Sequence, residues 1–80
     1  MVEYAVKTPP HHATWQEFLD VWRAIDECEA YAQAWTFDHF YSLGGDMYPG
    51  IGDSHGSCLE SWTMLAALAQ ATSRIRIGSM

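Results

Sequence analysis

The feature that most constrains this chain is the alternation of short apolar segments with longer helical patterns. The apolar segments predict strands at residues 4–8 and 31–37 and a third strand from residue 74, separated by helical spacing at residues 14–29 and 58–72. The middle segment has little polar alternation, which is typical of a strand buried on both faces. A chain with this β-α-β-α-β order builds a parallel sheet through right-handed crossovers. The sequence therefore predicts an α/β fold with three parallel strands.

Two spacings mark the expected helix starts. Thr14 with Glu17, and Ser57 with Glu60, have the pattern of a capping box, in which a hydroxyl and a carboxylate satisfy free backbone amides at a helix start. After Thr14 the apolar residues recur on one stripe, which predicts a helix with one buried face. The stripe consists of Trp15, Phe18, Leu19, Trp22, Ile25 and Cys28. The second pattern is apolar or small nearly all round, so we expect that helix to be buried.

Charge and cysteine content exclude several classes of function. A net charge of −6 with only four Lys and Arg argues against a nucleic-acid binder and against an anionic membrane surface. No apolar run approaches the roughly 18 residues of a membrane span, and no signal-type segment is present. The two cysteines, Cys28 and Cys58, are too few for a disulfide scaffold. We expect a cytoplasmic protein with both thiols reduced and packed in helices.

The acid–imidazole pair Asp38–His39 is the main candidate site. It ends the middle strand and precedes a long glycine-rich loop at residues 41–56, whereas such connections usually have about two to six residues. Parallel α/β folds place active sites at the carboxyl ends of their strands. His11 and His12 follow the first strand at the same edge, and His55 lies in the long loop. The sequence thus predicts a cluster of titratable side chains at this edge.

Each of these features has a structural alternative. The pair at 38–39 could hold a strand end through hydrogen bonds to backbone, and the pair at 11–12 could be exposed. Asp53 and His55 lie among glycines and are expected to be solvated. Residues 50–52 (Gly-Ile-Gly) begin like a dinucleotide-binding fingerprint but do not follow a strand and lack its third glycine. The cysteines and histidines have no recognised zinc spacing, so we expect no metal site.

Four segments occur in a fixed order: residues 7–11 (Lys-Thr-Pro-Pro-His), 35–40 (Trp-Thr-Phe-Asp-His-Phe), 58–63 (Cys-Leu-Glu-Ser-Trp-Thr) and 65–78, which ends in Thr-Ser-Arg-Ile-Arg-Ile-Gly. Together they resemble the amino-terminal part of the bacterial luciferase-like monooxygenase superfamily. The closest similarity is to its deazaflavin (coenzyme F420)-dependent oxidoreductases. The resemblance implies a (β/α)8 TIM barrel several times longer than this chain. Residues 1–80 would be its first β-α-β-α-β portion, an incomplete part of one domain.

The resemblance also implies a function. Family members transfer hydride with F420 to or from a small organic substrate, and the acid–His pair lies against the cofactor ring. Asp38 and His39 are therefore expected to bind the cofactor, with His39 as the catalytic residue. FMN remains an alternative cofactor, and an FMN-dependent monooxygenase of the same superfamily an alternative function. The family's phosphate-binding loops come from later strands, so we expect residues 1–80 alone to be inactive. We also expect the isolated chain to be aggregated or molten, because the strands that would close the barrel are missing. The resemblance allows a homodimer of the full-length form.

A second hypothesis belongs to another class of protein. Three strands and two helices leave one sheet face and two sheet edges uncovered. The chain could then be a free-standing α/β binding module without enzymatic activity, which dimerises through its open edges. A cooperative melt of the 80-residue chain alone would favour this hypothesis.

Overall fold

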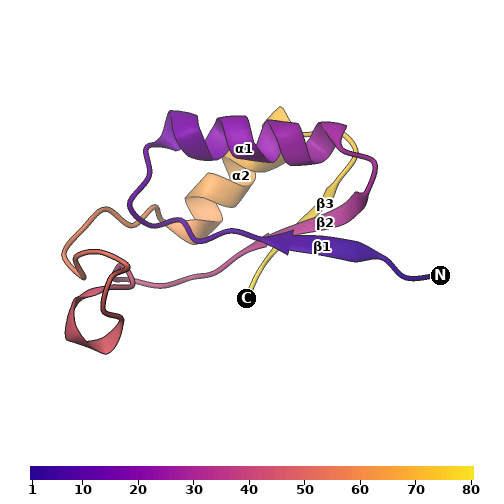
Figure 1. Ribbon diagram of the computed structural model, residues 1–80. Helices are drawn as coiled ribbons and strands as arrows, with labels where there is room; N and C mark the ends of the chain where they lie inside the picture. The colour runs from indigo at the N-terminus through magenta and orange to yellow at the C-terminus, as the bar shows by residue number, and fades with distance from the viewer.

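The elements follow one another in the expected β-α-β-α-β order in the computed structural model, which describes all 80 residues. The strands are β1 (Tyr4–Lys7), β2 (Tyr31–Thr36) and β3 (Arg76–Ser79), and the helices are α1 (Trp15–Glu27) and α2 (Ser61–Ala71). A short 3-10 turn, η1 (Gly45–Met47), lies in the long loop. The sheet has the order β1-β2-β3 and is parallel throughout, as predicted (Figure 1). No helix has the length and apolarity needed to cross a membrane.

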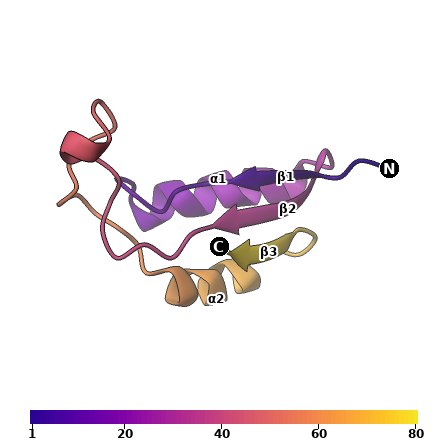
Figure 2. The same ribbon diagram turned by 90° about the horizontal axis from the view of Figure 1, so that it is seen from below.

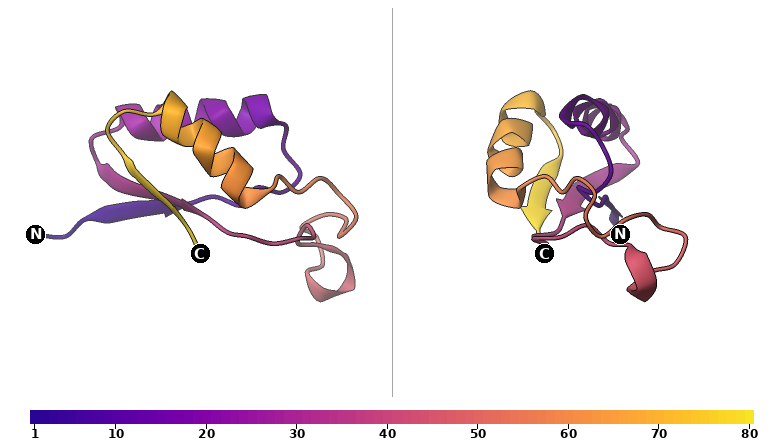
Figure 3. Two further views of the ribbon diagram at one scale, coloured as in Figure 1. Left: turned by 180° about the vertical axis from the view of Figure 1, so that it is seen from behind. Right: turned by 90° about the vertical axis from the view of Figure 1, so that its left-hand side faces the viewer.

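Both helices cover the same face of the sheet, and the other face is open (Figure 3). Successive residues of a strand point to opposite faces. On β2, Ala34 and Thr36 are fully buried beneath the helices, whereas Gln33 and Trp35 are half-buried on the open face. The prediction that β2 is buried on both faces is therefore wrong for these residues, because no other element covers the second face.

The core lies between the two helices and the covered face of the sheet. Its nine residues are Phe18, Leu19, Trp22, Ile25, Ala34, Met64, Leu65, Leu68 and Ile75. The predicted stripe of α1 is confirmed, because four of the nine come from it. The capping box is also present, with the Thr14 hydroxyl accepting from the Glu17 N–H and the Glu17 carboxylate accepting from the Thr14 N–H.

The predicted start of the second helix is wrong. α2 begins at Ser61, and Glu60 is its N-cap, whose carboxylate accepts hydrogen bonds from the Trp62 and Thr63 N–H groups. Residues 57–59 are instead tied to residues 10–12, since the His12 N–H donates to the Ser57 carbonyl and the Leu59 N–H to the Pro10 carbonyl. Backbone groups used in this pairing are not available to a helix. Cys58 therefore lies outside any helix.

Two further expectations need correction, one about the burial of α2 and one about the cysteines. α2 is buried on one side only, and Trp62 on its outer side is 67% exposed. No element in these residues covers that side. Cys28 is the exposed residue that ends α1, so neither free thiol is packed in a helix.

Asp26 at the end of α1 holds the turn that leads into β3. Its carboxylate accepts hydrogen bonds from the backbone N–H groups of Ser73, Arg74 and Ile75, at 3.0, 2.9 and 2.8 Å. The Arg74 guanidinium donates in return to carbonyls at the end of α1, including that of Cys28 at 2.8 Å. The hydrogen bonds that the Asp26 carboxylate accepts from backbone N–H groups lower its pKa below the ordinary value of 3.8, and the bond from Ile75 contributes most.

Replacing Asp26 by alanine is expected to lower the free energy of unfolding by about 1.5–3 kcal/mol, the usual worth of hydrogen bonds to a charged group. The lowered pKa means that the folded state binds the carboxyl proton more weakly than the unfolded state does. The stabilisation is thus complete above pH about 4, and it is lost as the pH falls through the folded-state pKa. Urea unfolding of the natural gene product at its full length, at several pH values, measures this loss of free energy of unfolding. Glu27→Ala is the control. A difference between wild type and Asp26→Ala that persists undiminished at pH 2 would contradict the assignment.

Candidate functional site

The carboxyl ends of the three strands lie at one edge of the sheet, next to the long loop (Figure 2). The chain continues the ladder past β2 by pairing with Met80. The Met80 N–H donates to the Thr36 carbonyl at 3.0 Å, and the Asp38 N–H donates to the Met80 carbonyl at 3.3 Å. The backbone of the predicted pair at residues 38–39 is therefore attached to the sheet at Asp38.

Three aromatic rings from two segments meet at this edge. The ring centroids of Phe37 and His39 are 4.3 Å apart, and those of His11 and Phe37 are 5.0 Å apart. The two imidazoles, of His11 and His39, are 5.5 Å apart. The Lys7 ammonium lies 5.1 Å from the Phe37 centroid, within the range of a cation–π contact. The edge thus carries two imidazoles and one cation around Phe37.

Asp38 and His39 are both exposed and do not form an ion pair, since the one ion pair of the chain joins Arg76 to Glu3. Consecutive side chains of a strand-like segment leave on opposite sides, which separates the carboxylate from the imidazole. Asp38 lies near Cys58 instead. Burial, and secondarily the charge of Asp38, raise the pKa of the Cys58 thiol, which donates to the His39 carbonyl at 3.1 Å.

The neighbouring histidines at positions 11 and 12 differ in environment. His11 is only 7% exposed, whereas His12 is exposed and has a backbone φ of 56°. Both bind the peptide groups of Leu43: its N–H donates to His11 Nδ1 at 2.9 Å, and its carbonyl lies 2.9 Å from His12 Nε2. The two side chains thereby attach the long loop to the segment after β1. Burial of His11 was one of the features that the sequence left open.

Glycines allow the loop to pack on the His12 ring. A Cβ at Gly56 would lie 2.4 Å from His12 Nδ1, and a Cβ at Gly52 would lie 2.9 Å from its Nε2. The buried Ser42 hydroxyl donates to the carbonyls of Gly56 and Ser57, which closes the loop on itself. The loop at residues 41–56 is therefore built through defined contacts, although it contains little regular structure. Asp53 and His55 within it are exposed, as expected.

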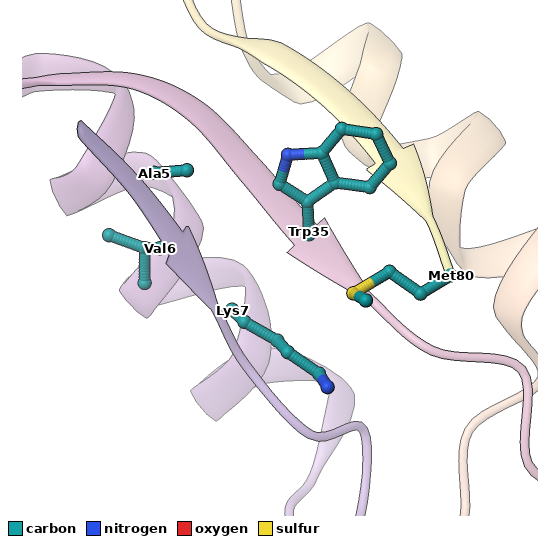
Figure 4. A pocket seen from close by; sticks show the side chains of 5 residues that line it. All are labelled: Ala5, Val6, Lys7, Trp35 and Met80. Atoms are coloured by element: carbon teal, nitrogen blue, oxygen red, sulfur yellow. The ribbon is translucent and has the colours of Figure 1, made fainter. Parts of the chain in front are cut away.

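A hollow on the open face of the sheet adjoins this edge (Figure 4). Its volume is about 350 Å³, and its lining residues are Ala5, Val6, Lys7, Trp35 and Met80. The Trp35 indole lies against Gly78, where a Cβ would come within 2.6 Å of the ring. The indole N–H donates to the Gln33 side chain at 2.9 Å. Lys7 connects the hollow to the three aromatic rings, because its ammonium also lies over the Phe37 ring.

Asp38, His39 and His11 lie at the carboxyl edge, where the sequence predicted them, and the structure adds Lys7 and Phe37 to this group. Lys7 and Phe37 stand at strand ends, so strand position was the available signal for them. No three His, Cys, Asp or Glu side chains lie close enough together to hold a metal ion. What the edge offers chemically is proton donors and acceptors beside an apolar hollow.

A parallel sheet that carries titratable side chains at its carboxyl edge is typical of α/β proteins, which have their active sites at the carboxyl ends of the strands. Within that class the chain belongs to the luciferase-like monooxygenase family, whose sequence model matches residues 2–80. The match spans all five main elements and includes Asp38 and His39, so the predicted family is confirmed. Comparisons with curated proteins and with solved structures gave no match.

Proposed function

We propose that residues 1–80 form the first β-α-β-α-β portion of a (β/α)8 TIM barrel in a luciferase-like oxidoreductase. The open face of the sheet supports this. In such a barrel the inward-facing side chains pack against those of other strands, and the helices cover the outside. Trp35 and Gln33 on the open face would then point inward, and α1 and α2 would lie outside.

The proposed cofactor is F420, with FMN as the alternative. The residues at the edge fit a planar heterocycle: the buried Phe37 ring lies 4.3 Å from the His39 ring, the His39 side chain is exposed, and a buried ring nitrogen of His11 has no partner. When bound, such a cofactor supplies the hydride donor or acceptor, and the protein supplies orientation and proton handling.

His39 is proposed as the residue that moves the proton. Removing a hydride from an alcohol carbon leaves the hydroxyl proton to be taken up, and the reverse reaction requires a proton to be given back. An imidazole performs both near neutral pH. Asp38 is proposed to bind the cofactor as a hydrogen-bond acceptor. The observation that carries the proposal is the exposed imidazole of His39 at the carboxyl edge of a chain that matches the family over residues 2–80.

The test is a fluorescence titration of the natural gene product that carries these residues, at its full length, with F420 and with FMN. Tight binding of F420 and much weaker binding of FMN would support the proposal. The opposite order would select the FMN-dependent monooxygenase. Binding of neither, in a protein that melts cooperatively, would favour the non-enzymatic binding module.

Residues 1–80 alone are expected to bind neither cofactor at micromolar concentration. Both cofactors carry phosphate, yet the chain has a net charge of −6 and few free cations. Arg76 is paired with Glu3, and the Arg74 guanidinium is bound to backbone carbonyls, so Lys7 is the cation that the structure places at the site. The same titration on the 80-residue chain measures this, and a micromolar dissociation constant would show that the edge is sufficient by itself.

A further inference from the structure

His11 contains a buried polar atom without a partner. Its side chain is 7% exposed, and Nε2 makes no hydrogen bond. Buried polar atoms in folded proteins are nearly always paired, so an unpaired one needs an explanation. The only other such atom is the Thr36 hydroxyl oxygen, on the face of β2 that the helices cover. His11 differs because it lies at the carboxyl edge.

The loop fixes the position of the proton on the His11 ring. The Leu43 N–H donates to Nδ1 at 2.9 Å, and an N–H group can donate only to a ring nitrogen that carries no proton. In the neutral ring the proton is therefore on Nε2. Burial, followed by the nearby His39 and His12, lowers the pKa of His11 and keeps the ring neutral. Nε2 is thus a hydrogen-bond donor with a fixed direction and no acceptor.

The surroundings of this donor connect it to the proposed cofactor site. The Phe37 and His39 rings lie 5.0 and 5.5 Å from the His11 ring, centroid to centroid. Phe37 is buried, but His39 is exposed, and exposed side chains change rotamer within nanoseconds. His39 is the exposed one of these two rings, so a change of its rotamer is the step by which a ligand at the edge would reach Nε2.

We propose that His11 is a binding residue of this site, and that its Nε2–H donates to a carbonyl oxygen of the bound cofactor ring. The inference rests on the proposed function for the nature of the ligand. Deazaflavin and flavin rings both carry carbonyl oxygens, so the role is the same for either cofactor. Leu43, through its N–H, orients the donor, and the long loop is thereby a part of the binding site.

Two substitutions separate binding from loop support. Asparagine places an oxygen near the position of Nδ1, so His11→Asn retains an acceptor for the Leu43 N–H but has no group at Nε2. Glutamine reaches the position of Nε2 with an amide donor, so His11→Gln retains the donor and loses the acceptor. A His11 whose only role is to accept from the Leu43 N–H would keep cofactor affinity with asparagine. A binding His11 would not.

The experiment measures F420 and FMN affinity in the natural gene product at its full length, together with the melting temperature. Loss of one neutral hydrogen bond corresponds to about 2- to 10-fold in affinity. We expect His11→Asn to fold and to bind the cofactor weaker by about that factor, and His11→Gln to bind more tightly than His11→Asn. Wild-type affinity in a folded His11→Asn protein would overturn the inference and leave the proposed function intact. Absence of binding in the wild type would overturn both.

A measurement on the wild type keeps the inference testable if His11→Asn does not fold. Long-range proton–nitrogen NMR correlations distinguish the two tautomers of each histidine. We expect the Nε2–H form for His11 and a shift of its Nε2 signal when cofactor is added. An Nδ1–H form, or a signal that cofactor leaves unchanged, would overturn the inference.

Discussion

Replacing His39 by alanine is expected to lower turnover by about 10²- to 10⁴-fold, the usual contribution of a positioned general acid or base. The natural gene product at its full length is the protein to test, with F420 and a panel of alcohols and carbonyl compounds as hydride donors and acceptors. The side chain is exposed and outside the core, so the fold and the melting temperature should not change.

His55→Ala is the matched control for this prediction. His55 is also exposed, and its one hydrogen bond involves its backbone N–H and Asp53, not its imidazole. We expect turnover close to that of the wild type in this control. If His39→Ala left both turnover and cofactor affinity unchanged, His39 would have no part in the reaction, and the role assigned to the carboxyl edge would fail.

The second large effect concerns Trp22, the largest fully buried side chain of the core. Trp22→Ala should lower the free energy of unfolding by about 3–5 kcal/mol, because it removes most of a buried aromatic ring. It also removes the indole N–H that donates to the Thr8 hydroxyl at 2.8 Å, which joins α1 to the end of β1. In the natural gene product at its full length, a loss of this size should lower the urea midpoint well below that of the wild type.

Far-UV circular dichroism and urea unfolding of the natural gene product at its full length measure this effect. Val21→Ala is the matched control, since Val21 is the adjacent residue of α1 and is 49% exposed. The control should unfold close to the wild type. A Trp22→Ala chain with a native spectrum and a similar urea midpoint would show that the core described here does not stabilise the chain.

Local sequence patterns predicted the elements well where the interactions are local. The capping box of Thr14 and the stripe of α1 depend on residues three or four positions apart, and the structure confirms both. The start of α2 was misplaced because the same kind of spacing at Ser57 and Glu60 has a long-range competitor. Pairing of residues 57–59 with residues 10–12 uses the backbone groups that a helix would need.

The sequence by itself determined the parallel β-α-β-α-β order, the family, and the position of Asp38 and His39 at the end of β2, because hydrophobic period and motif order are properties of neighbours along the chain. Only the tertiary structure decided which side chains meet there. His11 and Leu43 are far apart in sequence, yet their hydrogen bond buries one histidine and fixes its proton. Asp38 and His39 are adjacent in sequence and yet do not pair, since consecutive side chains of a strand-like segment point to opposite sides. Contacts between distant segments depend on how the sheet and the loop close in space, and no local pattern encodes that closure.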